Sequence, residues 1–209
     1  MTQEEFLRKL DKSYIGHPYE IVNGELIVNT TIGIVWEELP VKGNLFNSIK
    51  FISDEHVIIQ ETATPYDLTF DNRGLAEINL IECKSKITFT ERCTNVYLKK
   101  LEFIKEGAHL VFENVGRVSI PKLEYLTHSM EFKNQGHAEL DSVVNIPDGF
   151  AFRSKTSYLD LNSYKPEMDT GVSFTSSVYF YKGNTYDWDC NIEGIKPYKI
   201  LTSLLKKNK

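Results

Sequence analysis

The sequence predicts a mainly β protein, a short-repeat β-solenoid of about seven coils with about 20 residues in each coil. A pattern of eleven residues, with Phe at its third, Asn at its fifth and Gly at its seventh position, occurs in full three times, starting at Leu68, Leu110 and Met130. Apolar and polar residues alternate on both sides of the Asn-x-Gly, which indicates two short, half-buried strands in each copy. The Asn-x-Gly then forms the corner between them.

Weaker copies extend the repeat in both directions. They start at Leu26, Leu45, Ile87 and Phe150, so that successive copies start 19 to 23 residues apart. A single copy cannot cover its own apolar face, and stacked copies are needed to build a continuous core. We therefore expect one aromatic column inside the solenoid, formed by Phe70, Phe89, Phe112, Phe132 and Phe152.

The corner residues recur as well. We expect one column of asparagines, hydrogen-bonded to each other as a ladder, at Asn72, Asn114 and Asn134. The Gly two residues after each Asn can adopt a positive φ at no steric cost. Seven residues after each Gly an apolar residue returns, at Ile81, Leu123 and Val143. An antiparallel meander or sandwich would also fit strands at this spacing, but it does not require the same residue types at every second turn.

The repeat also invites a comparison with a known family. The Phe-x-Asn-x-Gly corner, followed by the Val-x-Ile-Pro-x-Leu of residues 118–123, resembles the short leucine-rich repeats of BspA-like proteins over residues 26–161. The resemblance implies a curved, parallel-stranded solenoid with a binding role, and it carries over no catalytic residue. The chain departs from the family pattern because it has the turn cysteine only at Cys93 and the proline only at Pro121 and Pro147.

Both ends of the chain differ from the repeat. We divide the sequence into an N-terminal helical cap at 1–21, the repeat solenoid at 22–164 and a C-terminal unit at 165–209. Open solenoid ends need covering because exposed strand edges invite aggregation. Thr2-x-x-Glu5 is a capping box and predicts a helix over 3–13 that covers the first coil.

The C-terminal unit is either a cap or a separate binding element. A β-hairpin is expected there, with strands at 178–181 and 185–188 joined by a turn at 182–184. A short helix should follow, since apolar residues have helical spacing at Ile200, Leu201, Leu204 and Leu205.

Charge and composition narrow the classes of partner. The formal net charge is −5, and the sequence has no basic surplus of the kind that nucleic-acid binders use to neutralise phosphates. The first residues show no signal-peptide pattern, and no apolar stretch approaches the roughly 18 residues of a membrane span. Three cysteines are too few for a secreted disulfide scaffold. We expect a cytoplasmic protein with no nucleic-acid or membrane partner.

The sequence indicates no catalytic residue, metal site or cofactor. Phosphate-binding loops, nucleophile elbows and paired metal-binding motifs are absent from it. We expect Cys83 and Cys93 to be buried, and we expect the scattered histidines to lie at the surface or in turns. The densest acidic cluster is interpreted as a solvated hairpin end, at Asp187, Asp189, Cys190 and Glu193.

The middle position of the second strand offers a candidate binding surface. In successive coils it is occupied by Glu77, Tyr97, Ser119, Glu139 and Asp160. If this face is exposed, it forms an acidic stripe with one aromatic residue, which suits a partner with a basic surface. Ordinary solvation of a polar face is the alternative interpretation.

We therefore expect a non-enzymatic scaffold for protein–protein interaction, such as a bacterial or phage inhibitor or immunity-type protein that binds another protein. A solenoid presents a long and rigid surface, which suits this role. One alternative is an enzyme built on a β-helix, for example a carbohydrate-active one, for which Glu77, Glu139 and Asp160 are the candidate carboxylates. A structural or oligomer-forming repeat protein is the other alternative.

Overall fold

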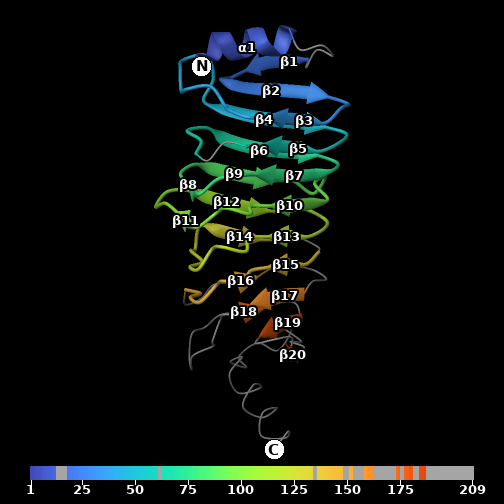
Figure 1. Ribbon diagram of the computed structural model, residues 1–209, viewed down its shortest axis with the longest axis vertical. Coiled ribbons are helices and arrows are strands. Elements are labelled where there is room, and N and C mark those ends of the chain that lie inside the picture. Colours follow the sequence, from blue (N-terminus) through green and yellow to red (C-terminus); the bar gives the residue numbers. More distant parts are fainter. Residues whose placement is uncertain are drawn as a thin grey trace, which may run out of the picture.

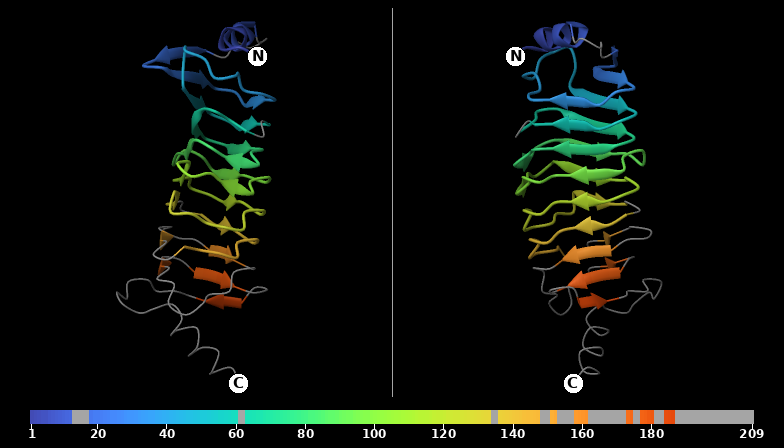
Figure 2. Two further views of the ribbon diagram at one scale, coloured as in Figure 1. Left: turned by 90° about the vertical axis from the view of Figure 1, so that its left-hand side faces the viewer. Right: turned by 45° about the vertical axis from the view of Figure 1, so that its right-hand side comes forward.

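The protein is a β-solenoid in which two long sheets face each other along one axis (Figure 1). The computed structural model describes residues 1–12, 18–60, 63–133 and 136–147, together with the backbone of the strands at 151–152, 158–161, 173–174, 177–180 and 184–186. The chain passes from the first sheet to the second and back in each coil, and the views of Figure 2 show the coils stacked from the N-terminal to the C-terminal end. Within the described part, no helix is long and apolar enough to cross a membrane.

The two long sheets have nine strands each. The first contains, in spatial order, β1 (Tyr19–Val22), β2 (Glu25–Thr30), β4 (Ser48–Ser53), β6 (Asp67–Asn72), β9 (Lys86–Phe89), β12 (His109–Phe112), β14 (Met130–Phe132), β16 (Ala151–Phe152) and β18 (Ser173–Phe174). The second contains β3 (Ile34–Trp36), β5 (Val57–Ile59), β7 (Leu75–Ile78), β10 (Asn95–Tyr97), β13 (Val118–Ser119), β15 (Ala138–Glu139), β17 (Tyr158–Leu161), β19 (Ser177–Phe180) and β20 (Asn184–Tyr186).

Parallel pairing confirms the predicted solenoid and excludes a meander. Neighbouring strands of the two sheets pair in parallel from β2 to β18 and from β3 to β19, and only β1 and β20 at the ends pair antiparallel. The pairs from β2–β3 to β14–β15 make about six turns over the residues described with side chains. A third side is formed by β8 (Glu82–Cys83) and β11 (Phe103–Ile104) and by a bridge between Tyr125 and Asn145.

The predicted aromatic column is present in the core. Phe70, Phe89, Phe112 and Phe132 lie in register, and the ring centroids of neighbours are 4.9–5.4 Å apart. Burial of such rings is the main apolar contribution to a core of this kind. The backbone of Phe152 pairs with that of Phe132, as predicted, while the side chain of Phe152 lies outside the description.

The column also contains Phe51, which the sequence did not predict. Ile49 pairs with Leu26 and Leu68, and Phe51 pairs with Phe70, so the second copy of the repeat starts at Ile49. The prediction that it starts at Leu45 is therefore wrong. Leu45 is exposed and Phe46 is buried against Tyr66 in the connection between β3 and β4. Leu45 and Phe46 are adjacent apolar residues in a long connection, and in the sequence such a pair looks like the start of a strand.

The asparagines do not form the predicted ladder. Asn72 and Asn114 are both fully buried, but their side-chain amides donate to main-chain carbonyls: Asn72 to Glu55 and Leu75, and Asn114 to Thr94, Gly116 and Arg117. Between them the coil of β9 places Cys93, whose Sγ lies 3.3 Å from Oδ1 of Asn72. Buried carbonyls at a corner need donors, and the amide supplies them at each turn. Asn134 lies outside the described residues.

The corner glycines serve close stacking rather than a positive φ. Among the described glycines, only Gly24 and Gly107 have a positive φ. A Cβ on Gly74 would lie 2.8 Å from the main chain of Glu55, and a Cβ on Gly116 or Gly136 would overlap the main chain of Thr94 or Gly116. The main chain of the preceding coil lies directly against the corner, so a side chain has no room there.

One recurring apolar residue lies outside the core. Leu123 and Val143 are buried as the repeat suggests, but Ile81 is 42% exposed and its neighbour Leu80 occupies the interior position instead. The coil of β7 reaches the third side one residue earlier than the other coils do, which turns Ile81 outward.

The N-terminal end is covered by α1 (Gln3–Lys12), drawn above the first coil in Figure 1. Thr2 Oγ1 accepts from the amide of Glu5 and Glu5 Oε2 accepts from the amide of Thr2, which is the expected capping box. Phe6 and Leu10 are buried, and the Phe6 ring meets Trp36 edge-on at 4.6 Å. The cap also includes β1, which the sequence did not predict, and the Asn23–Gly24 turn with φ of 52° and 78° joins it to β2.

The C-terminal strands continue both sheets. β18 pairs in parallel with β16, and β19 pairs in parallel with β17, while β19 and β20 form an antiparallel hairpin in the expected region. The expected acidic cluster at Asp187–Glu193 and the expected helix around Ile200–Leu205 lie outside the described residues.

Candidate interaction surfaces

The predicted stripe is aligned on the outer face of the second sheet. Register pairs Glu77 with Tyr97, Tyr97 with Ser119, Ser119 with Glu139, and the backbone of Glu139 with that of Asp160. The structure therefore brings together the five residues that the repeat placed at one position. Ile58 precedes Glu77 in the same row and Tyr179 follows Asp160.

The stripe has less free negative charge than its sequence suggests. Glu77 Oε2 lies 2.8 Å from Lys99 Nζ, which is also 5.4 Å from the centre of the Tyr97 ring. Glu139 forms an ion pair with Arg117 of the preceding coil. The carboxylate groups of Glu77 and Glu139 are mostly shielded, with side-chain exposures of 14% and 19%. These contacts join coils to each other, and they neutralise most of the acidic surface that a basic partner would need.

The distances between the carboxylates of the stripe test the alternative that the protein is an enzyme built on a β-helix. Glu77 and Glu139 are three coils apart, which amounts to about 14 Å at the usual strand spacing of about 4.8 Å. Glycosidase carboxylates face each other at about 5–10 Å. The structure thus does not bring this pair together. Glu139 and Asp160 are neighbours in the backbone register, but the side chain of Asp160 lies outside the description.

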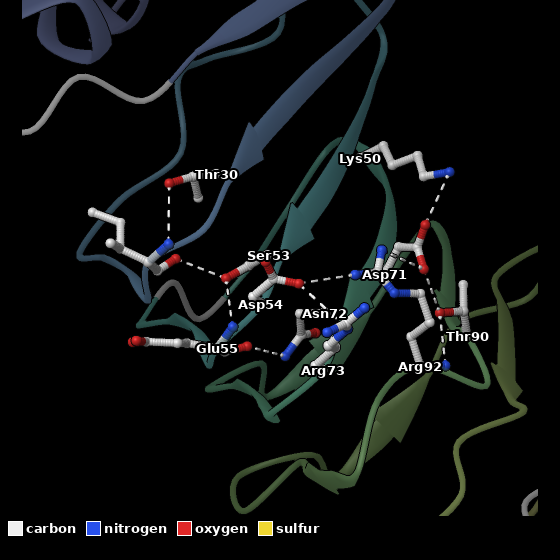
Figure 3. A network of polar contacts seen from close by, with 11 residues as sticks. Thr30, Lys50, Ser53, Asp54, Glu55, Asp71, Asn72, Arg73, Thr90 and Arg92 are labelled. Carbon is white, nitrogen blue, oxygen red and sulfur yellow. Dashed lines mark hydrogen bonds and ion pairs between the residues drawn. The ribbon is translucent and has the colours of Figure 1, made fainter.

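A second cluster of polar residues lies at the first corner, where β4 and β6 end (Figure 3). Asp71 is the centre of this corner network: it lies 3.3 Å from Lys50 Nζ, 3.6 Å from Arg92 and 3.0 Å from the Thr90 hydroxyl, which donates to it. Asp54 lies within 3.5 Å of both Arg73 and Arg92. Each of these ion pairs joins residues of different coils, and Asp54 contacts arginines of two further coils.

Hydrogen bonds extend the corner network toward the first coil. Ser53 donates its hydroxyl proton to the carbonyl of Ile32 and accepts from the amide of Glu55. Glu55 Oε2 in turn accepts from the amide of Gly33. The ion pairs and hydrogen bonds of this network link successive coils, which favours a role in holding the coils in register.

The third side carries four exposed apolar residues on successive coils. Ile81, Phe103, Tyr125 and Val144 are 42%, 60%, 56% and 47% exposed and belong to four successive coils. We call these four residues the apolar strip. Phe103 pairs with Glu82 and Tyr125 with Asn145, so Ile81 lies one register position from Phe103, and Val144 lies one register position from Tyr125.

The main chain beneath the apolar strip is well ordered by hydrogen bonds. The amides of Glu102 and Phe103 donate to the carbonyl of Ile81, and the amides of Val144 and Asn145 donate to the carbonyl of Glu124. Lys122 Nζ lies 3.5 Å from Glu102, which connects the two halves of the strip across neighbouring coils. Main-chain bonds therefore join the coils of Ile81 and Phe103, and separately the coils of Tyr125 and Val144.

The apolar strip was not predicted from the sequence, although the sequence contains a signal for it. Each of the four coils has an apolar-x-x-apolar segment whose first and last residues turn inward, at Leu80–Cys83, Leu101–Ile104, Leu123–Leu126 and Val143–Ile146. The two middle residues must then face solvent. Period-two alternation was sought instead, and this third side does not follow it.

The cysteines and histidines show no site in the described residues. Cys83 and Cys93 are fully buried as predicted, and desolvation raises the pKa of each thiol to about 11. His109 bonds to Glu131 at 2.9 Å. In the part of the chain with described side chains, no group of three His, Cys, Asp or Glu residues is arranged to hold a metal ion.

No family model, curated protein or solved structure matches this chain.

Proposed function

We propose that this protein is a non-enzymatic interaction scaffold that binds another protein through the apolar strip. The observation that carries the proposal is the exposure of four large apolar side chains, 42–60% each, on successive coils of one side. Single exposed apolar residues are ordinary on protein surfaces, whereas a contiguous set of them marks an interaction site. The predicted acidic stripe is not the preferred surface, because Lys99 and Arg117 pair with its glutamates.

Binding through the apolar strip should need little ordering of the main chain. Binding loses affinity when loops and side chains must be immobilised. Here the two aromatic members, Phe103 and Tyr125, are held by strand and bridge pairing to Glu82 and Asn145. Aromatic residues at the centre of an interface, with polar residues around them, are the usual composition of binding hot spots.

The proposal also includes a cellular role and a repeat family. A cytoplasmic bacterial or phage inhibitor that blocks another protein would fit the acidic chain and the rigid surface. Membership of the BspA-like leucine-rich repeats would fit the corner column, in which Asn72, Cys93 and Asn114 occupy successive buried positions.

The test compares the protein with a double variant, Phe103→Ser and Tyr125→Ser. Tagged proteins are used to capture partners from the lysate of a host cell, and captured proteins are quantified by mass spectrometry. The proposal expects at least one stoichiometric partner that the double variant loses. Val41→Ser is the matched control, because Val41 is 61% exposed but lies outside the apolar strip. Equal capture by the wild type and the double variant, or equal loss in the control, would overturn the proposal.

A further inference from the structure

We infer that the occupant of the apolar strip is an amphipathic helix of the partner, which lies along the solenoid axis and carries arginine beside its apolar face. The inference rests on the proposed function and deepens it by naming the element that is recognised.

Spacing favours a helix. The strip has one apolar residue in each of four successive coils, and parallel coils repeat about every 4.8 Å. A helix rises about 1.5 Å per residue, so apolar residues three or four positions apart recur about every 5.3 Å on one face. With apolar residues at i, i+3, i+7 and i+10, the helix rises about 15 Å while three coil steps span about 14.4 Å, and side-chain rotamers can absorb this difference of about 0.6 Å.

An extended segment fits the same strip less well. Its side chains on one face recur about every 6.8 Å, so over a length of about 14 Å it would present three side chains to four strip residues. A strand would also gain affinity by pairing with a free sheet edge. On the third side the main chains of Ile81 and Phe103 and of Glu124 and Val144 already bond to each other.

The charges beside the apolar strip define the polar face of the helix. Glu102 and Glu124 occupy the positions next to Phe103 and Tyr125, and Glu82 lies beside Ile81. Glu82 is paired with Lys84 at 2.7 Å and Glu102 with Lys122 at 3.5 Å. Glu124 is exposed and has no ion pair within the described residues. It is therefore the carboxylate that is available to a partner.

Arginine suits this position better than lysine. A planar guanidinium can accept a carboxylate on its edge and stack on an aromatic ring with its face. Glu124 and Tyr125 are neighbours in the chain and are both exposed, so one arginine could contact both. The recognised helix should then have apolar residues at positions i, i+3, i+7 and i+10 and an arginine within one turn of the third of them.

The test uses four synthetic peptides of 15 residues, titrated into the full chain and followed by fluorescence anisotropy. The first has leucines at i, i+3, i+7 and i+10 among alanines and arginines. The second has the same composition in an order that spreads the leucines around the helix. The third replaces each arginine by glutamate, and the fourth alternates leucine with threonine and arginine as a strand-forming sequence.

We expect the first peptide to bind at least about tenfold more tightly than each of the other three, because each additional 1.4 kcal/mol of binding energy corresponds to that factor. Glu124→Gln should weaken the first peptide about threefold to tenfold and should not weaken the glutamate peptide. The Phe103→Ser, Tyr125→Ser double variant should lose most binding, while Val41→Ser should bind as the wild type does.

Three results would overturn the inference: tighter binding of the strand-forming peptide, equal binding of the peptide with scattered leucines, or a dimer of the chain that dissociates in the double variant. The last would show that a second copy covers the apolar strip. The proposed function is judged separately by the lysate partner. If that partner is lost in the double variant while the helical peptide fails to bind, the function stands and the helical occupant is wrong.

Discussion

The rings of Phe89 and Phe112 are stacked in the core with their centroids 5.4 Å apart and their planes 4° from parallel. Their strands, β9 and β12, pair in register, so the two side chains leave the backbone at equivalent points. Phe70 and Phe89 are stacked in the same way, as are Phe112 and Phe132, while the ring of Phe51 is tilted by 37° against that of Phe70. Each ring therefore supports the ring of the coil above and of the coil below, and loss of one ring should affect both neighbours.

Phe112→Ala should destabilise the protein by about 3–5 kcal/mol, since it removes a fully buried ring and leaves a cavity between two others. The free energy of unfolding can be measured by urea denaturation followed by circular dichroism. Val115→Ala removes a side chain that is 44% exposed in the same coil, and it should change the stability by less than about 1 kcal/mol. Similar losses for both variants would contradict the stacked column.

Gly116→Ala should cost about 2–3 kcal/mol, because the new Cβ would overlap the carbonyl of Thr94 and force the coils apart. Gly107→Ala provides the matched comparison. Gly107 has a φ of +83° and no atom within 4 Å of the added Cβ, so its cost of about 1 kcal/mol is that of the backbone conformation alone. If urea denaturation ranks the two variants in the opposite order, the account of the corner by close stacking is wrong.

The buried thiols predict a loss of stability in alkaline solution. Desolvation raises the pKa of Cys83 and Cys93 from 9.0 to about 11, so the folded protein keeps two protons that the unfolded chain releases. Their contribution is complete below pH 9 and is lost as the pH rises through 11. Urea denaturation at pH 8, 9.5 and 11 measures the slope of the free energy of unfolding against pH. The Cys83→Ala, Cys93→Ala double variant should show a shallower one, and an unchanged slope would contradict the assignment.

Asp71→Asn should destabilise the protein by about 1–2 kcal/mol, because the corner network loses the charge that Lys50 and Arg92 share. The side chain of Asp71 is only 16% exposed, so salt should reduce its contribution incompletely. Glu38→Gln is the control: its partner Lys9 lies at 3.7 Å and both side chains are more than half exposed. That variant should change the free energy of unfolding by less than about 0.5 kcal/mol. Equal effects of the two substitutions would show that the corner network is an ordinary surface feature.

Particular residues show how far the sequence predicts this fold. Phe70, Phe112 and Phe132 recur at one offset with Asn and Gly, and the structure places all three in one column. The same repeat offset predicted the alignment of four residues of the stripe, Glu77, Tyr97, Ser119 and Glu139. Phe51 was missed because a start at Leu45, 19 residues after Leu26, fits the accepted spacing as well as the true start at Ile49, 23 residues after Leu26.

The surface was harder to predict than the core. Burial permits few residue types at a core position, so a recurring Phe is informative, whereas an exposed position accepts almost any residue. The charge of the stripe depends on Lys99 and Arg117, which come from neighbouring coils on opposite sides: Lys99 lies in the coil after that of Glu77, and Arg117 lies in the coil before that of Glu139. Exposure of Ile81 and Phe103 depends on where each coil turns, and a shift by one residue reverses the outcome.

The sequence by itself determined the period of the chain, the alternation within its strands and the identity of the stacked residues, because each of these is repeated in every coil and is local to it. The tertiary structure alone decided which coils neutralise each other's charges and which apolar residues remain outside. Those outcomes depend on contacts between side chains about 20 residues apart, and packing across the coils, rather than local pattern, sets them.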